Sequence, residues 1–166
     1  MPLETERYNM RRKEREIREL KEILDVIGRC KHCRLGLCDD NQPYIVPLNY
    51  GYACQDDVLT LYFHSAKEGK KMDIIKRNNK ACFEIDCDTH LIAGSSACSY
   101  GYQYRSVMCF GEITFLETVE EKRDGLNRLM QHQTGKETDF SFEDHELEKV
   151  VVYKMTVKTF TGKMRR

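Results

Sequence analysis

The sequence of 166 residues contains no tryptophan, only three prolines, and no apolar run near the roughly 20 residues that a membrane-spanning helix requires. We therefore expect no membrane partner. The first 18 residues are rich in charge where the apolar region of a secretory signal would lie. This absence favours a cytoplasmic location.

The sequence also lacks an excess of either charge. Lysine and arginine together number 27, and so do aspartate and glutamate, which gives a formal net charge of zero. Without an overall positive field, no nucleic acid partner is expected. Hydrophobic residues make up 40% of the chain, a share typical of a globular protein, and the length predicts a single domain over residues 1–166.

Eight cysteines do not require a disulfide framework here, because a chain of this length can bury a core without covalent links. We therefore expect reduced thiols. Cys30 and Cys33 form a C-x-x-C pattern, but the second pair that a zinc ribbon needs at similar spacing is missing. We predict no metal site. A redox or opportunistic metal role for Cys30, Cys33 and Cys38, together with His32, stays open.

Three segments have the features of helices. The first lies within residues 1–28, and Gly28 is a natural end for it. A short helix is expected over residues 66–78 and another over residues 119–133, each preceded by a capping-box pattern. The apolar positions expected to face inward are Ile17, Leu20, Leu24, Ile27, Met72, Ile75, Val119, Leu126, Leu129 and Met130.

Strand signals fill much of the remaining chain, as runs of β-branched and aromatic residues between turn-forming segments. They place barrel strands within residues 34–116 and a final strand after the last helix, with a bulge at Gly111. The predicted strands are 34–38, 44–52, 58–64, 81–85, 105–116 and 149–160. The first four are expected to form an antiparallel meander. The fold class predicted is mainly β, a six-stranded antiparallel barrel with flanking helices.

The strongest chemical signal follows the third predicted strand. If the short helix begins at Ser65, then Lys67, Lys70 and Lys71 lie in or beside its first two turns. The helix dipole already makes this end positive, so an anionic ligand is expected to offset the lysines. Free backbone N–H groups, the Ser65 hydroxyl and the ammonium groups of Lys70 and Lys71 would suit a phosphate. A solvated lysine cluster is the alternative.

His64 ends the strand just before this segment, so its ring could face a bound phosphate. A lone histidine on a strand is, however, more often a structural residue. Gly69 and Lys70 have the offset of a phosphate-binding P-loop, but His64 and Lys71 stand where that motif needs a glycine and a hydroxyl. No glycine-rich dinucleotide motif follows a strand either. The sequence therefore argues against a nucleoside triphosphatase and against a dinucleotide-binding fold.

Two specific motifs lie close together, Pro-Leu-Asn-Tyr-Gly at residues 47–51 and Tyr-Phe-His-Ser-Ala at residues 62–66. Further segments of the same pattern are Gly69–Lys71, Ala81–Glu84, Tyr104–Val107 and Gly111. Together they resemble the FMN-binding split barrels related to pyridoxamine 5'-phosphate oxidase, most closely the nitroimidazole-resistance (Nim-type) proteins. The resemblance runs from about Met10 to the end of the sequence.

The resemblance implies a six-stranded split barrel of the FMN-binding type, which forms a homodimer and holds FMN in a groove at the dimer interface. Strand residues would run along the edge of the isoalloxazine ring, namely Val46, Pro47, Leu48 and Asn49. The phosphate would be held by His64, Ser65, Lys70 and Lys71. Ser106, on a later strand, would approach the flavin.

The sequence departs from pyridoxamine phosphate oxidases at its end. Those enzymes finish with a substrate-binding stretch that carries Trp, Arg and His, which this sequence lacks, so vitamin B6 oxidation is disfavoured. We expect a flavoprotein oxidoreductase that uses FMN to reduce small electron-poor acceptors, of which a 5-nitroimidazole is the example that the family suggests. His64 is the candidate catalytic proton donor, and Tyr100, Tyr102 and Tyr104 are candidates for stacking on substrate. The alternatives are a non-catalytic flavin-nucleotide binding or redox-sensing module and a haem-binding split barrel.

Overall fold

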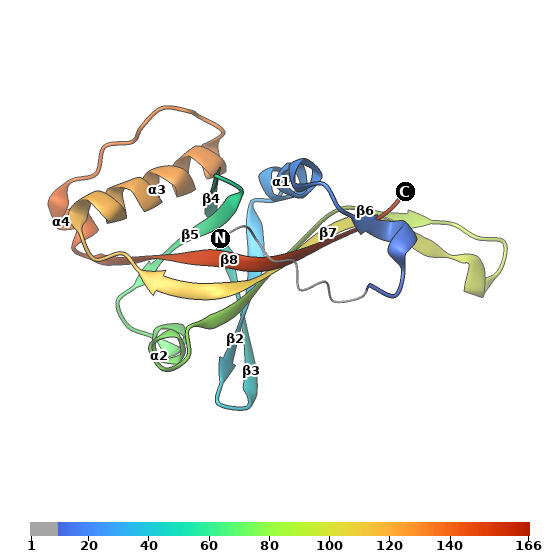
Figure 1. Cartoon of the computed structure of the whole chain (residues 1–166), viewed down its shortest axis with the longest axis horizontal. Helices are drawn as coiled ribbons and strands as arrows, with labels where there is room; N and C mark the ends of the chain where they lie inside the picture. Colours follow the sequence, from blue (N-terminus) through green and yellow to red (C-terminus); the bar gives the residue numbers. More distant parts are fainter. Residues whose placement is uncertain (1–9) are drawn as a thin grey trace.

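Eight antiparallel strands form one continuous sheet in the computed structural model, which describes residues 10–166 (Figure 1). The strands are β1 Glu16–Ile17, β2 His32–Asp39, β3 Gln42–Asn49, β4 Gly51–Gln55, β5 Val58–Ala66, β6 Lys80–Ile92, β7 Gly101–Phe115 and β8 Val150–Arg165. The α-helices are α1 Leu20–Arg29, α2 Lys70–Arg77, α3 Val119–Thr134 and α4 Asp144–Leu147. The predicted mainly β class with flanking helices is confirmed.

The sheet is split rather than closed. Its strands follow the order β3-β2-β6-β7-β8-β5-β4, with β1 added to β8. The two edge strands, β3 and β4, are consecutive in the chain and are separated only by Tyr50. Because one residue joins the two edges, the sheet curls back on itself, while no ladder of hydrogen bonds joins β3 to β4.

Tyr50 explains why eight strands form instead of the six predicted. The predicted strand over residues 44–52 is interrupted there, because the Tyr50 side chain is fully buried and its hydroxyl donates to the carbonyl oxygens of Ile27 and Cys30, at 2.7 and 2.9 Å. The two-residue β1 is the other addition. The predicted meander is correct for the hairpins β2–β3 and β4–β5 only, since β2 pairs next with β6 and β5 with β8.

The N-terminal helix is shorter than predicted. Residues 1–9 lie outside the described part of the chain, and residues 13–17 form a 3₁₀ turn and β1. Gly28 does not end α1, which continues to Arg29 and is capped by Cys30. The buried face of α1 consists of Ile23, Val26 and Ile27, while the predicted Leu20 and Leu24 are only partly buried.

Helix α3 covers the outer face of β4, β5 and β8 (Figure 1). Its predicted capping box is confirmed, because the Thr118 hydroxyl accepts from the Glu121 N–H at 3.1 Å and the Glu121 carboxylate accepts from the Thr118 N–H. Leu126 and Leu129 are buried as predicted, whereas Val119 is exposed. The helix ends at Gly135, whose φ of 71° is the left-handed conformation that glycine adopts without strain.

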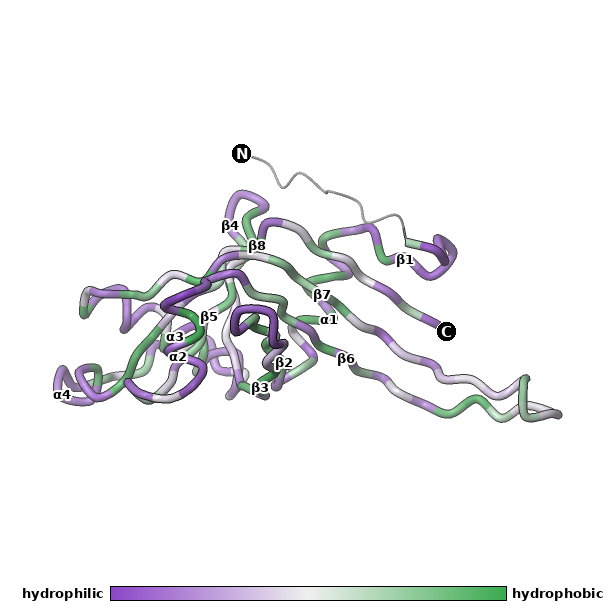
Figure 2. Tube along the Cα trace, turned by 90° about the horizontal axis from the view of Figure 1, so that it is seen from below, coloured by the Kyte–Doolittle hydropathy of each residue, from purple (hydrophilic) through white to green (hydrophobic). Residues whose placement is uncertain are grey.

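Strands β6 and β7 continue beyond the barrel as a two-stranded ribbon, which we call the arm and which comprises residues 86–105 (Figures 1 and 2). A register shift after Cys87 begins the outer part of the arm, and Asp88 there has a positive φ of 55°. A second register shift lies between Phe110 and Gly111 opposite β8, so the predicted bulge at Gly111 is confirmed. None of the described helices is long and apolar enough to cross a membrane.

Candidate functional site

The junction of β5 and α2 differs from the predicted helix start. Ser65 is not a helix cap, because β5 continues its ladder with β8 through the pairs Ser65–Val151 and Ala66–Val150. Helix α2 begins only at Lys70, after Gly69, whose φ is 132°. Ser65 is paired within the sheet. The capping-box pattern depends on neighbouring residues alone, so it could not predict this pairing with a distant strand.

This shift leaves the positive end of α2 without a side-chain cap. Lys70 and Lys71 are the first two residues of the helix, and no hydrogen bond is recorded from either backbone N–H within residues 10–166. Unbonded N–H groups at a helix start bind anions, and the dipole adds to that preference. The expectation of an anionic ligand therefore still applies, with two lysines at the helix start instead of three.

His64 and Lys71 lie close to one another at this junction. The His64 ring is half-buried, and its Nδ1 is buried and has no hydrogen-bond partner among residues 10–166. Burial, and then the charge of Lys71, lower the pKa of His64, while burial also lowers the pKa of Lys71. A bound anion would offset both effects, because it would accept hydrogen bonds from both groups.

Lys70 points to a different partner. Its ammonium lies 3.7 Å from the Asp39 carboxylate and 5.2 Å from the centre of the Tyr44 ring. Arg77, at the other end of α2, also binds Asp39. Lys70 therefore helps to hold α2 against the β2–β3 hairpin. No pattern in the sequence predicted these contacts of Lys70 with Asp39 and Tyr44.

Ser65 and His64 are consecutive strand residues, so their side chains point to opposite faces of the sheet. Ser65 is buried on the face of the barrel interior, as is Phe63, whereas His64 shares its face with Val152. The structure thus brings together His64, Lys71 and the start of α2. The Ser65 side chain lies on the opposite face of the sheet from His64.

The predicted ring-edge residues Val46, Pro47, Leu48 and Asn49 all lie on β3, an edge strand whose one partner in the described part of the chain is β2. Val46 and Leu48 pack against the barrel core, while Pro47 is exposed. A proline is compatible with this position because an edge strand does not need every N–H for pairing. The free edge of β3 could hydrogen-bond a planar ligand.

Within one chain, Ser106 lies far from the junction of β5 and α2. It pairs with Lys163 of β8, whereas His64 pairs with Val152 of the same strand. At about 3.3 Å per residue, these two partners are roughly 36 Å apart along β8. One flavin mononucleotide cannot reach both His64 and Ser106 of the same chain.

Exposed apolar side chains lie in a row across the outer face of the sheet. Ile45 of β3 is 67% exposed and Phe110 of β7 is 38% exposed, and the paired residues Gly36 and Cys82 lie between them. Met108, 39% exposed, stands beside Phe110 on the same face of β7. This apolar row is a candidate contact surface.

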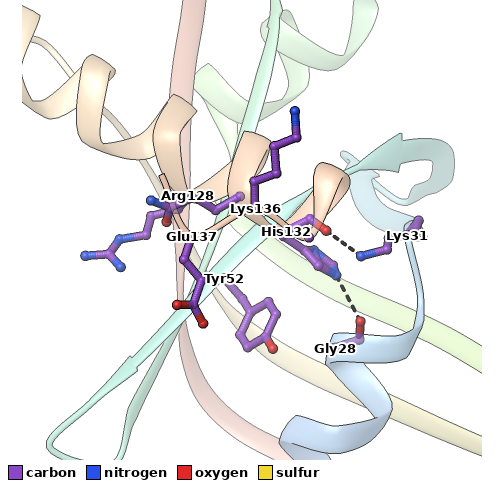
Figure 3. A pocket seen from close by; sticks show the side chains of 9 residues that line it. Gly28, Lys31, Tyr52, Arg128, His132, Lys136 and Glu137 are labelled. Carbon is purple, nitrogen blue, oxygen red and sulfur yellow. Dashed lines mark hydrogen bonds between the residues drawn. The ribbon is translucent and has the colours of Figure 1, made fainter. Parts of the chain in front are cut away.

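A separate pocket of about 560 Å³ lies where α1 and α3 end (Figure 3). It contains none of the predicted site residues. Its buried His132 has Nδ1 at 2.9 Å from the Tyr50 carbonyl oxygen, and Lys31 donates to the His132 carbonyl oxygen. Burial, and then the charge of Lys31, lower the pKa of His132 to about 4. We interpret His132 as a structural residue that joins α3 to the turn at Tyr50.

No three metal-binding side chains come together among residues 10–166. All eight cysteines are free thiols. Cys109 is fully buried among apolar residues of the core, as expected for a small packing residue.

The split antiparallel sheet, with α2 inserted after β5 and α3 across the outer face, defines a split-barrel protein. The sequence profile described as pyridoxamine 5'-phosphate oxidase matches residues 19–164. The chain therefore belongs to the pyridoxamine 5'-phosphate oxidase family. No curated protein matches its sequence.

Solved structures support this assignment. A Bacteroides thetaiotaomicron protein, assigned provisionally to 5-nitroimidazole antibiotic resistance, is 36% identical, with a TM-score of 0.77 over 89% of this chain and 85% of its own. The flavocytochrome Anf3 of Azotobacter vinelandii is 16% identical, with a TM-score of 0.77 over 94% of this chain and 72% of its own. An FAD- and haem-binding protein of Mycobacterium smegmatis is 14% identical, with a TM-score of 0.78 over 92% and 74%. The last two show the fold alone.

Proposed function

We propose that this protein is a homodimeric, FMN-dependent oxidoreductase that reduces small electron-poor acceptors, with 5-nitroimidazoles as the example. The observation that carries the proposal is the pair His64 and Lys71 at the uncapped start of α2, where a buried ring nitrogen and a desolvated ammonium both lack an anionic partner within residues 10–166. The relative at 36% identity supports the choice of acceptor.

The residues at this junction suit the phosphate of FMN. A phosphate monoester offers several acceptor oxygens and up to two negative charges, which match the two free N–H groups, the Lys71 ammonium and the His64 ring. Lys70 would contribute mainly by keeping α2 in place, through Asp39 and Tyr44. The edge of β3 from Val46 to Asn49 would meet the ring through backbone groups.

Bound FMN would supply the transfer of electrons to the acceptor. The protein would bind the phosphate, orient the ring along β3 and exclude water. His64 would donate a proton from its imidazole to the reduced acceptor. Burial and the charge of Lys71 lower the pKa of His64 in the absence of an anion, and the phosphate of FMN would counter that shift.

A second copy of the chain is required if Ser106 is to approach the flavin. The distance between Ser106 and His64 along β8 is too long for one FMN molecule to contact both residues of a single chain. If the apolar rows of two chains packed against each other, His64 of one chain and Ser106 of the other could contact the same FMN. The exposed Ile45, Met108 and Phe110 support such a contact surface. The free thiols of the chain suit the reducing cytoplasm, where we place the protein.

The test is purification without added cofactor, followed by denaturation and identification of the small molecule released. FMN in a ratio near one per chain, together with reduction of a 5-nitroimidazole by the purified protein, is the expected result. Release of FAD, or of no flavin even after incubation with FMN, would contradict the proposal.

Two alternatives differ in their spectra and turnover. A flavin-nucleotide binding or redox-sensing module would hold flavin without reducing any nitro compound, disulfide or quinone. A haem-binding split barrel would show a Soret band instead of flavin absorption. The unpartnered Nδ1 of His64 is the observation that favours the haem alternative, since a neutral imidazole nitrogen is a haem ligand.

A further inference from the structure

A groove runs along helix α2 on the side of the last residues of β7. It consists of two adjoining hollows of about 260 and 580 Å³, which share Lys76, Phe115 and Glu117. The smaller hollow is also lined by Lys67, Met72, Leu116, Lys122 and Val151. Ligand sites commonly have volumes of about 300–1,000 Å³, so the groove has room for a small molecule.

The floor of the groove is apolar. Met72 and Leu116 are buried there, while Phe115 and Val151 are half-buried and keep part of their surface open to the groove. Met72 and Lys76 are four residues apart and therefore share one face of α2, which places Lys76 beside the floor. An apolar molecule would cover the open part of these side chains.

The rim of the groove carries an excess of positive charge. Lys67 and Lys76 are exposed, and Lys122 donates to the carbonyl oxygen of Leu147, a neutral group, at 3.4 Å. Within residues 10–166, none of these three rim lysines forms an ion pair with a carboxylate. Glu117 is the one acidic side chain among the described residues that line the groove.

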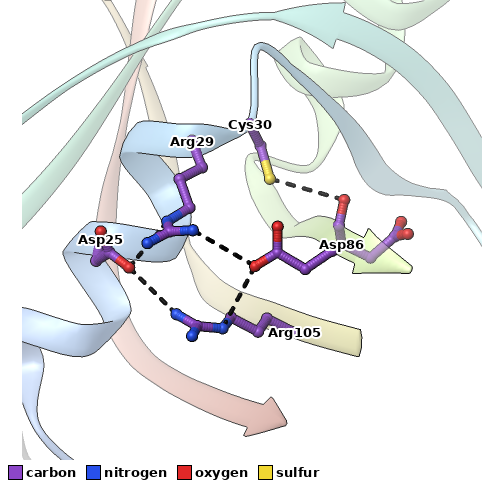
Figure 4. A network of polar contacts seen from close by, with 6 residues as sticks. Asp25, Arg29, Cys30, Asp86 and Arg105 are labelled. Carbon is purple, nitrogen blue, oxygen red and sulfur yellow. Dashed lines mark hydrogen bonds and ion pairs between the residues drawn. The ribbon is translucent and has the colours of Figure 1, made fainter. Parts of the chain in front are cut away.

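The cations at the base of the arm are arranged differently. Arg29 and Arg105 each contact both Asp25 and Asp88, at N–O separations between 3.0 and 3.6 Å (Figure 4). Two positive and two negative side chains balance there without any ligand. The groove has three lysines and one glutamate, so an anion would be needed to balance its rim.

We propose that this groove is a binding site for a small amphiphilic carboxylate, such as a medium-chain fatty acid. The apolar chain packs on the floor, and the carboxylate lies among the three rim lysines. Burial of the chain supplies most of the affinity. The lysines make the site select an anion over a cation with the same chain.

The groove is separate from the junction that we assign to FMN. Val151 lines the groove and directly precedes Val152, which pairs with His64. Consecutive strand residues point to opposite faces of a sheet, so the Val151 side chain lies on the other face from His64. Neither His64 nor Lys71 lines the groove.

The experiment titrates decanoate into the purified full-length protein, isotope-labelled at its methionine methyl groups, and follows the Met72 signal by NMR. The expected result is a saturable shift of Met72, with no shift of Met108 on the outer face of β7. Decyltrimethylammonium, which has the same chain length and a positive charge, should bind at least about tenfold more weakly.

Variants of the rim test the role of charge. Lys67→Gln and Lys76→Gln should each weaken decanoate binding roughly threefold, the size expected for an exposed ion pair. Glu117→Gln should strengthen binding by a similar factor because it removes a repelling charge, and a misfolded protein would not show such a gain. Lys158→Gln, in an exposed lysine outside the groove, is the matched control and should bind decanoate normally.

Three results would overturn the proposal: no saturable shift of Met72, equal binding of the cationic analogue, or displacement of decanoate by FMN. The proposal does not rest on the flavin assignment. Lys71→Ala, which is expected to lose affinity for FMN, should bind decanoate normally, so failure of one proposal is distinguishable from failure of the other.

Discussion

The ammonium of Lys71 and the imidazole of His64 lie at the same junction, and the charge of Lys71 lowers the pKa of His64. Both groups favour a bound anion. His64 lies near the end of strand β5, and Lys71 lies in the first turn of α2. Burial opposes the charged form of each. A bound phosphate would stabilise the charged forms of both side chains. For this reason the junction is the centre of the proposed site.

Replacement of Lys71 by alanine is expected to weaken FMN binding about 10- to 100-fold, because a hydrogen bond to a charged group contributes about 1.5–3 kcal/mol. Fluorescence titration measures the change. Lys67→Ala, in the exposed loop before α2, is the matched control and should bind normally. Riboflavin, which lacks the phosphate, should bind equally to Lys71→Ala and to the unaltered protein. An equal loss of both flavins would place Lys71 away from the phosphate.

Nitroimidazole reduction is expected to slow as the pH rises from 6 to 8. His64 donates only in its protonated form, and an imidazole loses its proton as the pH rises through the neutral range, so the donor becomes scarcer. The kcat profile of His64→Gln should be lower and should lose this slope, with FMN still bound. An unchanged slope in the variant would assign the proton to another group or to water.

The replacement Phe110→Glu is expected to convert a dimer into monomers and to reduce bound flavin, because it puts a charge into the apolar row. Sedimentation velocity gives the mass, and absorbance at the flavin band gives occupancy. Val119→Glu is the matched control, since Val119 on α3 is also 38% exposed but lies outside the row. A Phe110→Glu monomer that keeps its flavin would refute a site shared between two chains.

His132 should make the protein sensitive to acid. The fold holds this ring neutral, with a pKa of about 4 against a usual value of 6.5, so its contribution is present above pH 6.5 and is lost as the pH falls toward 4. Between pH 7 and 4.5 the loss is about 2 kcal/mol in the free energy of unfolding. Urea denaturation at the two pH values should show a smaller loss in His132→Gln. Equal losses would mean that the ring is already charged in the folded protein.

Local patterns predicted the local elements well. The capping box of Thr118 and Glu121, the bulge at Gly111 and the buried Leu126 and Leu129 depend on neighbouring residues, and each is present. The same reasoning failed at Ser65, where an equally good capping pattern lies in a strand. Pairing of Ser65 with Val151 across 86 positions outweighs a single cap, because it belongs to a ladder of seven residue pairs.

The candidate site was predictable only in part. Lys70 and Lys71 could be associated with a helix start from the sequence, and both are the first residues of α2. The different partners of Lys70 and the opposite faces of His64 and Ser65 depend on the strand register, which no local pattern contains. Whether the site residues on β3 and Ser106 serve the same cofactor stays a prediction.

By itself the sequence determined the mainly β class, the positions of the strand-rich segments and the motifs that resemble a flavin-binding family, because periodicity, turn residues and short motifs are local properties. Only the tertiary structure decided that Tyr50 divides one predicted strand into two sheet edges, and that the charge of Lys71 acts on the His64 ring. These relationships arise from pairing between distant segments around one buried core. Their energy comes from contacts that exist only once the chain has folded.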